Sequence, residues 1–169
     1  ISRADGLTGL ANRRYFDEFL QREWLRARRN QECLALIMID VDEFKSYNDY
    51  YGHLQGDDCL RRIGAALVQT VKRSSDLVAR YGGEEFAVVL PATSEKGALE
   101  LAVQIQQAVA SACIRHERSH SGEFITVSMG IATFTPQGDD TYRELVAVAD
   151  QALYQAKRQG RNCICLASH

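Results

Sequence analysis

The sequence predicts an α/β fold, a single mixed-sheet domain of about five strands that contains an antiparallel hairpin and is covered by helices. Three observations favour this class. Residues 34–41 are a continuous apolar run, too short for a typical helix and typical of a buried strand. Residues 77–90 hold two short runs of strand composition around a Gly-Gly pair, which indicates a hairpin. Several other stretches carry apolar residues at helical spacing.

The composition excludes several classes of protein. The 169 residues are 46% apolar and 25% charged with a formal net charge of −2, so no global field attracts nucleic acid or a membrane surface. No apolar run approaches the ~18 residues of a membrane span, and no signal peptide is evident. The five cysteines are an odd number and suit reduced thiols in the cytoplasm. Because the chain begins at Ile1, we expect it to be part of a longer protein, which other regions could tether to a membrane.

The helices are marked by capping residues and apolar stripes. They are expected at about 13–27, from residues 56–58 to 71, at 95–115 and at 141–160. Asn12 suits the N-cap of the first helix, while Thr141 and Glu144 form a capping-box pattern at the start of the last. Gly160 is placed to end that last helix.

The strands carry the residues of greatest interest. At the end of the run 34–41, period-2 alternation puts Asp40 and Asp42 on one face, where α/β sheets often hold a site. The alternative is that both aspartates simply cap a strand-to-loop transition. Residues 124–134 form a long alternating strand whose face at Ser128 and Gly130 is small enough for a helix to approach closely. Residues 163–166 are a short final strand.

The hairpin turn presents two acids. Because primed turns need positive φ, which glycine adopts freely, the pair Gly82-Gly83 is expected to form the turn and to lift Glu84 and Glu85 to its tip. Adjacent carboxylates on a glycine-rich tip suit a hard cation and leave room for a bulky anion. The alternative is a solvated acidic tip.

Together these acids suggest phosphoryl chemistry. The chain has neither a Gly-x-x-x-x-Gly-Lys-Ser/Thr loop nor a Gly-x-Gly-x-x-Gly turn, so phosphates must be held in another way. Carboxylates from two strands can hold one or two Mg²⁺ ions, which polarise a phosphoryl centre and activate a hydroxyl. Lys157 and Arg161, near the end of the last helix, could neutralise the phosphates, or merely complement the helix dipole.

A second metal pattern competes with this one. Residues 116–120 read His-Glu-x-x-His, the zinc-protease pattern, which requires a stable helix so that both histidines share a face. Here the pattern falls in a polar segment where the helix at 95–115 ends, and no third ligand is evident. A zinc hydrolase is therefore the weaker interpretation.

The pentapeptide Gly82-Gly-Glu-Glu-Phe86 resembles the signature of the diguanylate cyclases, the GGDEF/GGEEF family. Residues 5–14, 39–57, 127–132 and 149–162 resemble the other motifs of that family, in the same order and at matching spacing. The resemblance covers nearly the whole chain and implies one catalytic domain, residues 1–169, with a palm-like, ferredoxin-like architecture. It implies condensation of two GTP molecules into cyclic di-GMP and two pyrophosphates.

The resemblance also implies roles for single residues. Asp40, Glu84 and the carbonyl of Val41 bind Mg²⁺ or Mn²⁺, with two ions in each half-site, and Glu84 or Glu85 helps to deprotonate the attacking 3′-hydroxyl. The substrate-binding residues form two groups. Guanine is read by Asn48 and Asp57, with His53 beside them, and the phosphates are held by Phe44, Lys45, Lys157 and Arg161. The acid Glu43 departs from the family pattern and is expected to face solvent.

Symmetry and regulation follow from the same resemblance. A symmetric cyclic dinucleotide needs two α-phosphates and two 3′-hydroxyls, so two subunits of a homodimer must face each other as half-sites. Arg73 and Asp76 resemble the product-inhibition site, although a solvated turn could contain the same pair. An upstream sensory or regulatory domain would hold the subunits together. The alternative function is a catalytically silent receptor for cyclic di-GMP.

Overall fold

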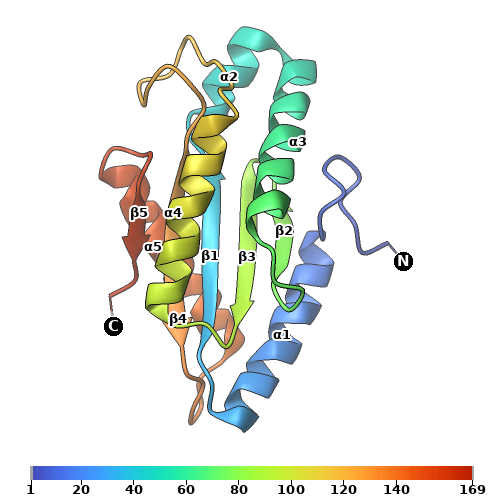
Figure 1. Cartoon of the computed structure of the whole chain (residues 1–169), viewed down its shortest axis with the longest axis vertical. Helices are drawn as coiled ribbons and strands as arrows, with labels where there is room; N and C mark the ends of the chain where they lie inside the picture. The colour runs from blue at the N-terminus through green and yellow to red at the C-terminus, as the bar shows by residue number, and fades with distance from the viewer. Residues whose placement is uncertain (1, 169) are drawn as a thin grey trace.

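A five-stranded mixed sheet lies between two layers of helices in the computed structural model, which describes residues 2–168 (Figure 1). Its strands are β1 (Leu34–Val41), β2 (Leu77–Gly82), β3 (Glu85–Pro91), β4 (Val127–Phe134) and β5 (Ile164–Leu166). They lie in the order β2-β3-β1-β4-β5. Strand β1 pairs antiparallel with both β3 and β4, and β5 runs parallel to β4. The predicted mixed sheet with an antiparallel hairpin is confirmed.

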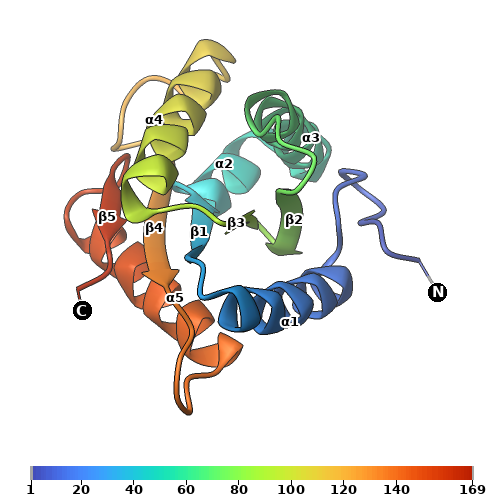
Figure 2. The same ribbon diagram turned by 60° about the horizontal axis from the view of Figure 1, so that its bottom comes forward.

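The helices divide between the two faces of the sheet (Figure 2). One face is covered by α2 (Phe44–Tyr51), α3 (His53–Thr70) and α4 (Glu95–Ser111), and the other by α1 (Arg13–Asn30) and α5 (Tyr142–Arg158). The order β1-helix-β2-β3-helix-β4 and the strand order are those of a ferredoxin-like domain, to which α1, α5 and β5 are added. No helix within residues 2–168 is both long and apolar enough to cross a bilayer.

Strand β1 forms the centre of the core. All of its residues are buried. Ala35, Ile37 and Ile39 pack toward α3 and α4, whereas Leu36 and Met38 pack toward α1 and α5. This two-sided burial explains why β1 appears in the sequence as an unbroken apolar run rather than an alternating one.

Several boundaries differ from the sequence expectations. Residues 44–51 form a helix that was not predicted, and α3 begins at His53 rather than at 56–58. Helix α4 ends at Ser111, because Cys113 adopts a left-handed φ of +50° and the chain then turns into a short bridge between Arg115 and Phe124. Consequently, β4 starts at Val127 rather than at 124.

The hairpin turn is also displaced by one residue from the expectation. Only Gly83 has a positive φ, +42°, while Gly82 still pairs with Glu85 across β2 and β3. The turn is therefore formed by Gly83 and Glu84. Glu84 lies at the tip as expected, but Glu85 is the first residue of β3 and not a tip residue.

Gly130 of β4 confirms the expected close approach of a helix to the sheet. A Cβ at this position would lie 2.1 Å from the backbone nitrogen of Leu153 and 2.5 Å from the carbonyl oxygen of Ala149, both on α5. Backbone atoms on both elements cannot move aside as a flexible side chain can. The small residue thus lets α5, which carries Lys157, pack directly on β4.

We therefore expect Gly130→Ala to destabilise the domain by about 3 kcal/mol through overpacking. Denaturant unfolding would measure the change. Gly64→Ala on α3 is the matched control, since its Cβ would meet only side-chain atoms at 3.4 Å or more. That control should be neutral or stabilising by about 0.5–1 kcal/mol, because alanine is the better helix former. Equal stability of the two variants would contradict the account of the β4–α5 contact.

Candidate nucleotide and metal site

The end of β1 and the tip of the hairpin meet at one edge of the sheet. Asp40 lies opposite Glu85 in the ladder between β1 and β3. The backbone N–H of Val41 donates a hydrogen bond to the carbonyl oxygen of Glu84 at 3.1 Å. The predicted carboxylates from two separate segments are thus held side by side by backbone hydrogen bonds rather than by their own side chains.

The pKa values of Asp40 and Glu85 show that the acids of this cluster are buried and close together. Burial raises the pKa of Asp40 to about 6, against the opposing effect of Lys157, whose Nζ donates a hydrogen bond to Oδ2 of Asp40. The charges of Glu84 and Glu85 raise it further. Burial, and then the charge of Asp150, also raise the pKa of Glu85. A cation that entered this cluster would relieve the repulsion between the acids.

The donor set fits a hard cation that brings part of its own coordination shell. Within residues 2–168, no three His, Cys, Asp or Glu side chains are grouped closely enough to hold a metal ion. Asp40, Glu84 and the backbone carbonyl of Val41 supply oxygen atoms only. Mg²⁺ prefers oxygen and is usually bound by one or two carboxylates plus water and substrate phosphates.

Asp42 points away from this cluster. Its Oδ2 accepts hydrogen bonds from Thr126 Oγ1 at 2.7 Å and from the N–H of Asn162 at 2.9 Å, and its Oδ1 accepts one from Ser128 Oγ at 2.6 Å. The carboxylate therefore fastens β4 and the segment after α5 to the end of β1. Of the two interpretations left open by the sequence, capping is the one that the contacts support for Asp42.

Helices α2 and α3 bring the expected guanine-binding residues to the same end of the molecule. Asn48 lies on α2, one turn after Phe44, which is expected to bind phosphate. His53 and Asp57 lie in the first turns of α3. The Oδ1 atom of Asn48 is buried without a hydrogen-bond partner. A Cβ on Gly56 would lie only 1.7 Å from that atom, so glycine at 56 is what lets the Asn48 amide pack against α3.

The expected cations come from both helix layers, Lys45 from α2 and Lys157 from α5. Lys157, in the last turn of α5, contacts Asp40 as described. Arg161 is exposed and adopts a left-handed φ of +66°, and its backbone N–H donates to the carbonyl of Ala156 at 3.1 Å. Lys45 is exposed in the first turn of α2. The structure thus brings Lys157 directly to the acids, while Arg161 follows on the segment that Asp42 fastens.

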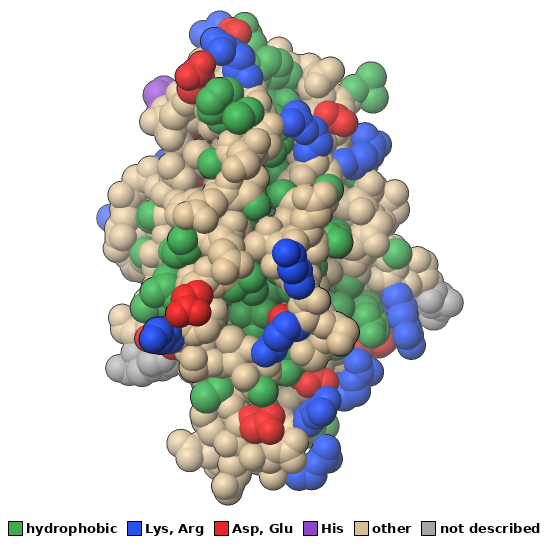
Figure 3. All heavy atoms as spheres, viewed as in Figure 1, with side chains coloured by type: hydrophobic (Ala, Val, Ile, Leu, Met, Phe, Trp, Pro, Cys, Tyr) green, Lys and Arg blue, Asp and Glu red, His purple; other side chains and the backbone are tan. Residues whose placement is uncertain are grey.

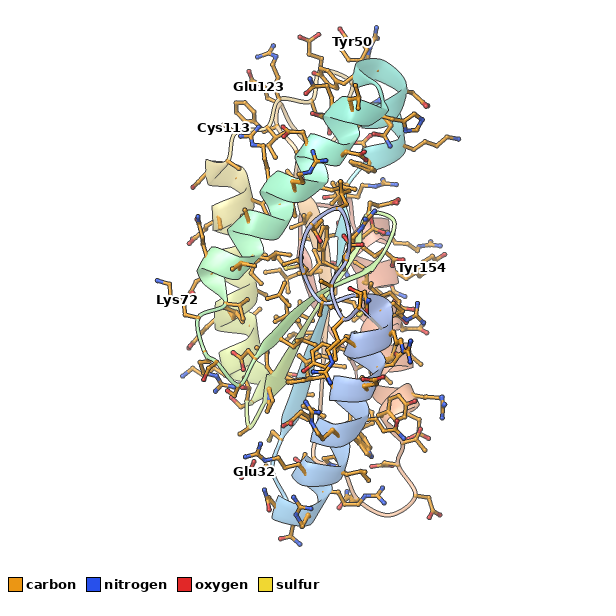
Figure 4. All side chains as sticks on the ribbon, turned by 90° about the vertical axis from the view of Figure 1, so that its right-hand side faces the viewer. Glu32, Tyr50, Lys72, Cys113, Glu123 and Tyr154 are labelled. Carbon is orange, nitrogen blue, oxygen red and sulfur yellow. The ribbon has the colours of Figure 1, made fainter. Side chains whose placement is uncertain are left out.

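Arg73 and Asp76 form a separate site near the far end of α3. The Arg73 guanidinium bonds both oxygens of Asp76 and also donates to the Pro91 carbonyl and to Thr93 Oγ1, at 2.6 and 3.1 Å. This pair lines a surface pocket of about 320 Å³ together with Lys72, which Figure 4 shows at the end of α3 remote from Tyr50. The exposed Arg73 and its partner Asp76 thus line a surface pocket next to the turn that holds them.

The His-Glu-x-x-His segment does not form a zinc site. Residues 116–120 are not helical, so the two histidines do not share a helix face. His116 is 1% exposed and its Nε2 bonds the carbonyl of Glu43 at 3.0 Å, whereas His120 is exposed. The requirement of the zinc pattern for a stable helix is not met.

Charge on the molecular surface is mixed. On the face displayed in Figure 3, Lys and Arg side chains lie among Asp and Glu side chains, with several cations along the α1 edge. On α1 itself, Arg13 and Arg14 pair with Asp17 and Glu18. This face does not offer the continuous basic surface typical of nucleic-acid binding.

The fold and the paired carboxylates at its sheet edge define a palm-like nucleotidyl-transfer domain. Residues 2–163 match the family described as "Diguanylate cyclase, GGDEF domain", and the chain belongs to that family. It is 42% identical over 158 residues to the diguanylate cyclase DosC of Escherichia coli (strain K12), covering 94% of this chain but 34% of DosC. The chain therefore spans about a third of the length of that relative.

Solved structures agree with the family assignment. The GGDEF domain of DgcB from Caulobacter crescentus, in complex with c-di-GMP, superposes with a TM-score of 0.88 at 33% identity, over 98% of this chain and 96% of that domain. The active GGEEF domain of a diguanylate cyclase from Vibrio cholerae superposes with a TM-score of 0.83 at 34% identity, over 95% of this chain and 99% of that domain. The palm-like fold expected from the sequence is confirmed.

The raised pKa of Asp40 predicts a pH-dependent cost to stability. Because the pKa in the folded chain is about 6 and the usual value is 3.8, the stability linked to this group is fully present below about pH 4 and is lost as the pH rises through 6. Asp40→Asn, measured by unfolding in metal-free buffer, should therefore stabilise the domain at pH 8 by about 2 kcal/mol. The gain should shrink toward zero at pH 4. A gain that grew as the pH fell would contradict this account.

Proposed function

We propose that this chain is the catalytic domain of a diguanylate cyclase, which condenses two GTP molecules into cyclic di-GMP and releases two pyrophosphates. The observation that carries the proposal is the register of β1 against β3, which places Asp40 opposite Glu85 and ties Val41 to Glu84 beside Lys157. Family membership and the similarity to DosC support the same activity.

In this proposal, the acids hold metal and handle the proton. Asp40, Glu84 and the Val41 carbonyl bind Mg²⁺ or Mn²⁺, two ions per half-site, which when bound polarise the α-phosphate and lower the pKa of the attacking 3′-hydroxyl. Glu84 or Glu85 accepts the hydroxyl proton. The pKa of Glu85, raised by burial, brings that carboxyl closer to the range that suits a general base near neutral pH.

The nucleotide lies between α2 and α5 in this proposal. Asn48 and Asp57 read the guanine edge, with His53 beside them. The buried Oδ1 of Asn48 has no hydrogen-bond partner within the chain, which supports a role for this amide in binding a ligand. The phosphates are held by four residues of the two helices and the segment that follows α5. These residues are Phe44, Lys45, Lys157 and Arg161.

Turnover requires a second copy. One site supplies one 3′-hydroxyl and one α-phosphate, so the cyclic product needs two facing half-sites of a homodimer. We propose that Arg73 and Asp76 bind the product in the pocket near Lys72 and inhibit turnover, and that an upstream sensory or regulatory domain controls dimerisation. GTP supply and the five free cysteines both favour a cytoplasmic location. The net charge of −2 favours neither nucleic-acid binding nor direct membrane contact.

Turnover of GTP tests the proposed activity directly. A tethered dimer of this domain, incubated with GTP and Mg²⁺ and followed by nucleotide chromatography, should form cyclic di-GMP. Glu84→Gln should reduce the rate by about a thousandfold or more, because it removes a metal ligand and a candidate base. Thermal unfolding of the variant should remain similar, since Glu84 lies at the hairpin tip. Cyclic di-GMP binding without turnover in the parent would instead indicate a silent receptor.

Product inhibition is expected to depend on Arg73. Arg73→Ala should raise the inhibitory concentration of cyclic di-GMP by about tenfold or more, because charged hydrogen bonds to the ligand are lost. The initial rate, measured before product accumulates, should be unchanged. Arg14→Ala is a matched control, since Arg14 is an exposed arginine whose acidic partner Glu18 lies on α1. Inhibition of Arg73→Ala at the parental concentration would exclude this pocket as the inhibitory site.

A further inference from the structure

Glu43 contradicts the expectation that it faces solvent. Its side chain is 13% exposed. Oε2 of Glu43 accepts hydrogen bonds from Ser119 Oγ and the N–H of His120, both at 2.7 Å, and from the N–H and Oγ of Ser121, both at 3.1 Å. Its Oε1 bonds Nδ1 of His120 at 2.8 Å. One carboxylate thus binds three consecutive residues that lie more than seventy positions away in the chain.

The backbone of Glu43 is held from the same side. Its carbonyl oxygen accepts from Nε2 of the buried His116 at 3.0 Å as well as from the N–H of Tyr47 in α2. The His116 ring packs edge-on against Tyr47, with ring centroids 5.3 Å apart. Both the side chain and the main chain of Glu43 are therefore fastened to the segment that joins α4 to β4.

The same segment also contacts the other end of α2. The hydroxyl of Tyr50 donates to the Glu117 carboxylate at 2.9 Å, and the hydroxyl of Tyr51 accepts from the Glu117 N–H at 3.0 Å. Figure 1 shows this segment arching beside α2, and Figure 4 shows Tyr50 and Glu123 at the same end of the molecule. Residues 116–121, which we call the brace, thus span the whole length of α2.

The contacts with the brace keep the backbone of Glu43 in a conformation that is unfavourable for a non-glycine residue. Glu43 has a φ of +52°, in the left-handed region that non-glycine residues rarely occupy and at an energetic cost. The turn it makes lies between the Val41 carbonyl and the first turn of α2, where Phe44 and Lys45 present N–H groups without intrahelical partners. A relaxed turn would re-aim these groups and the start of α2 together.

Helix capping does not explain the carboxylate of Glu43. Glu43 occupies the N-cap position of α2 but makes no side-chain hydrogen bond to that helix. Its two oxygens instead accept hydrogen bonds from Ser119, His120 and Ser121. The carboxylate lies beside a turn proposed to bind phosphates. A negative charge at this turn would by itself weaken the binding of an anion. Glu43 therefore contributes through the hydrogen bonds that its carboxylate accepts.

We propose that Glu43 is a positioning residue, which fastens the brace to the turn between β1 and α2 and so holds that turn in the conformation that binds the nucleotide phosphates. The inference rests on the proposed cyclase function. It assigns a role to an acid that touches neither the metal nor the substrate.

A pair of variants separates this role from an effect of charge. Glu43→Gln and Glu43→Ala both remove the negative charge, but only glutamine can still accept from Ser119 and Ser121 and donate to Nδ1 of His120. We expect Glu43→Ala to raise the KM for GTP about tenfold, and Glu43→Gln by no more than about threefold. Glu123→Gln, an exposed acid paired with Arg115, should leave KM unchanged. A fall in KM in both Glu43 variants would show that charge alone matters and overturn the proposal.

The brace side provides an independent test. The double variant Ser119→Ala/Ser121→Ala leaves the turn residues intact and removes two of the five hydrogen bonds to the Glu43 carboxylate, so it should reproduce part of the rise in KM. Combined with Glu43→Ala, it should add little, since Glu43→Ala has already removed those two bonds. Fully additive effects would refute the coupling between Glu43 and the brace.

A measurement without turnover separates this inference from the proposed function. Hydrogen exchange at the Tyr47 amide, whose acceptor is the Glu43 carbonyl, should accelerate in Glu43→Ala but much less in Glu43→Gln. Binding of a non-hydrolysable GTP analogue with Mg²⁺ should weaken in the same order. A parent without cyclase activity would refute the proposed function, while these two readouts would still test positioning. Unchanged exchange and unchanged analogue binding in Glu43→Ala would overturn the inference.

Discussion

The antiparallel pairing of β1 with β3 is the constraint on which the site depends. It fixes Asp40 opposite Glu85 and brings the N–H of Val41 to the carbonyl of Glu84, so the acids are placed by the sheet rather than by attraction to each other. Because side chains alternate along a strand, a shift of one residue in this register would turn Asp40 to the opposite face. Burial of β1 on both faces makes such a shift costly, since Leu36 and Met38 would exchange environments with Ile37 and Ile39.

Three acids, Asp40, Asp42 and Glu43, lie at or just after the end of β1, and each contacts a different part of the molecule. Asp40 contacts Lys157 on α5, and Glu43 binds residues 119–121. Asp42 binds Ser128 of β4, Thr126 just before that strand, and the segment after α5. Burial raises the pKa of Asp40 and that of Glu85, which lies opposite it in the ladder. These two acids lie at the proposed reaction centre, while Asp42 and Glu43 beside them are hydrogen-bonded and hold that centre in place.

The sequence predicted the parts of the fold that local physics determines. The buried strand 34–41, the capping pair Thr141 and Glu144, and the small face at Gly130 were recognised from burial, capping and steric rules, and the structure contains all three. The end of α4, helix α2 and the environment of Glu43 were not recognised. All three depend on the segment 112–126, which contacts the turn before α2 and α2 itself. These contacts join residues far apart in the chain, so neither stretch shows a periodic pattern that would reveal them. Gly56 is similar, because its role is visible only through its contact with Asn48.

By itself, the sequence predicted which residues are candidates for the proposed chemistry. Asp40 and Glu84 indicated acids that bind a cation, and Lys157 indicated a positive charge that binds phosphates. The sequence can show this because the chemistry of a side chain is a local property. Only the tertiary structure decided which of those acids share a site. It separated Asp42 and Glu43 from Asp40, moved Glu85 from the hairpin tip into β3, and set Lys157 on Asp40. The physical reason is that the direction and burial of a carboxylate depend on the register of paired strands and on packed neighbours, which no stretch of sequence contains alone.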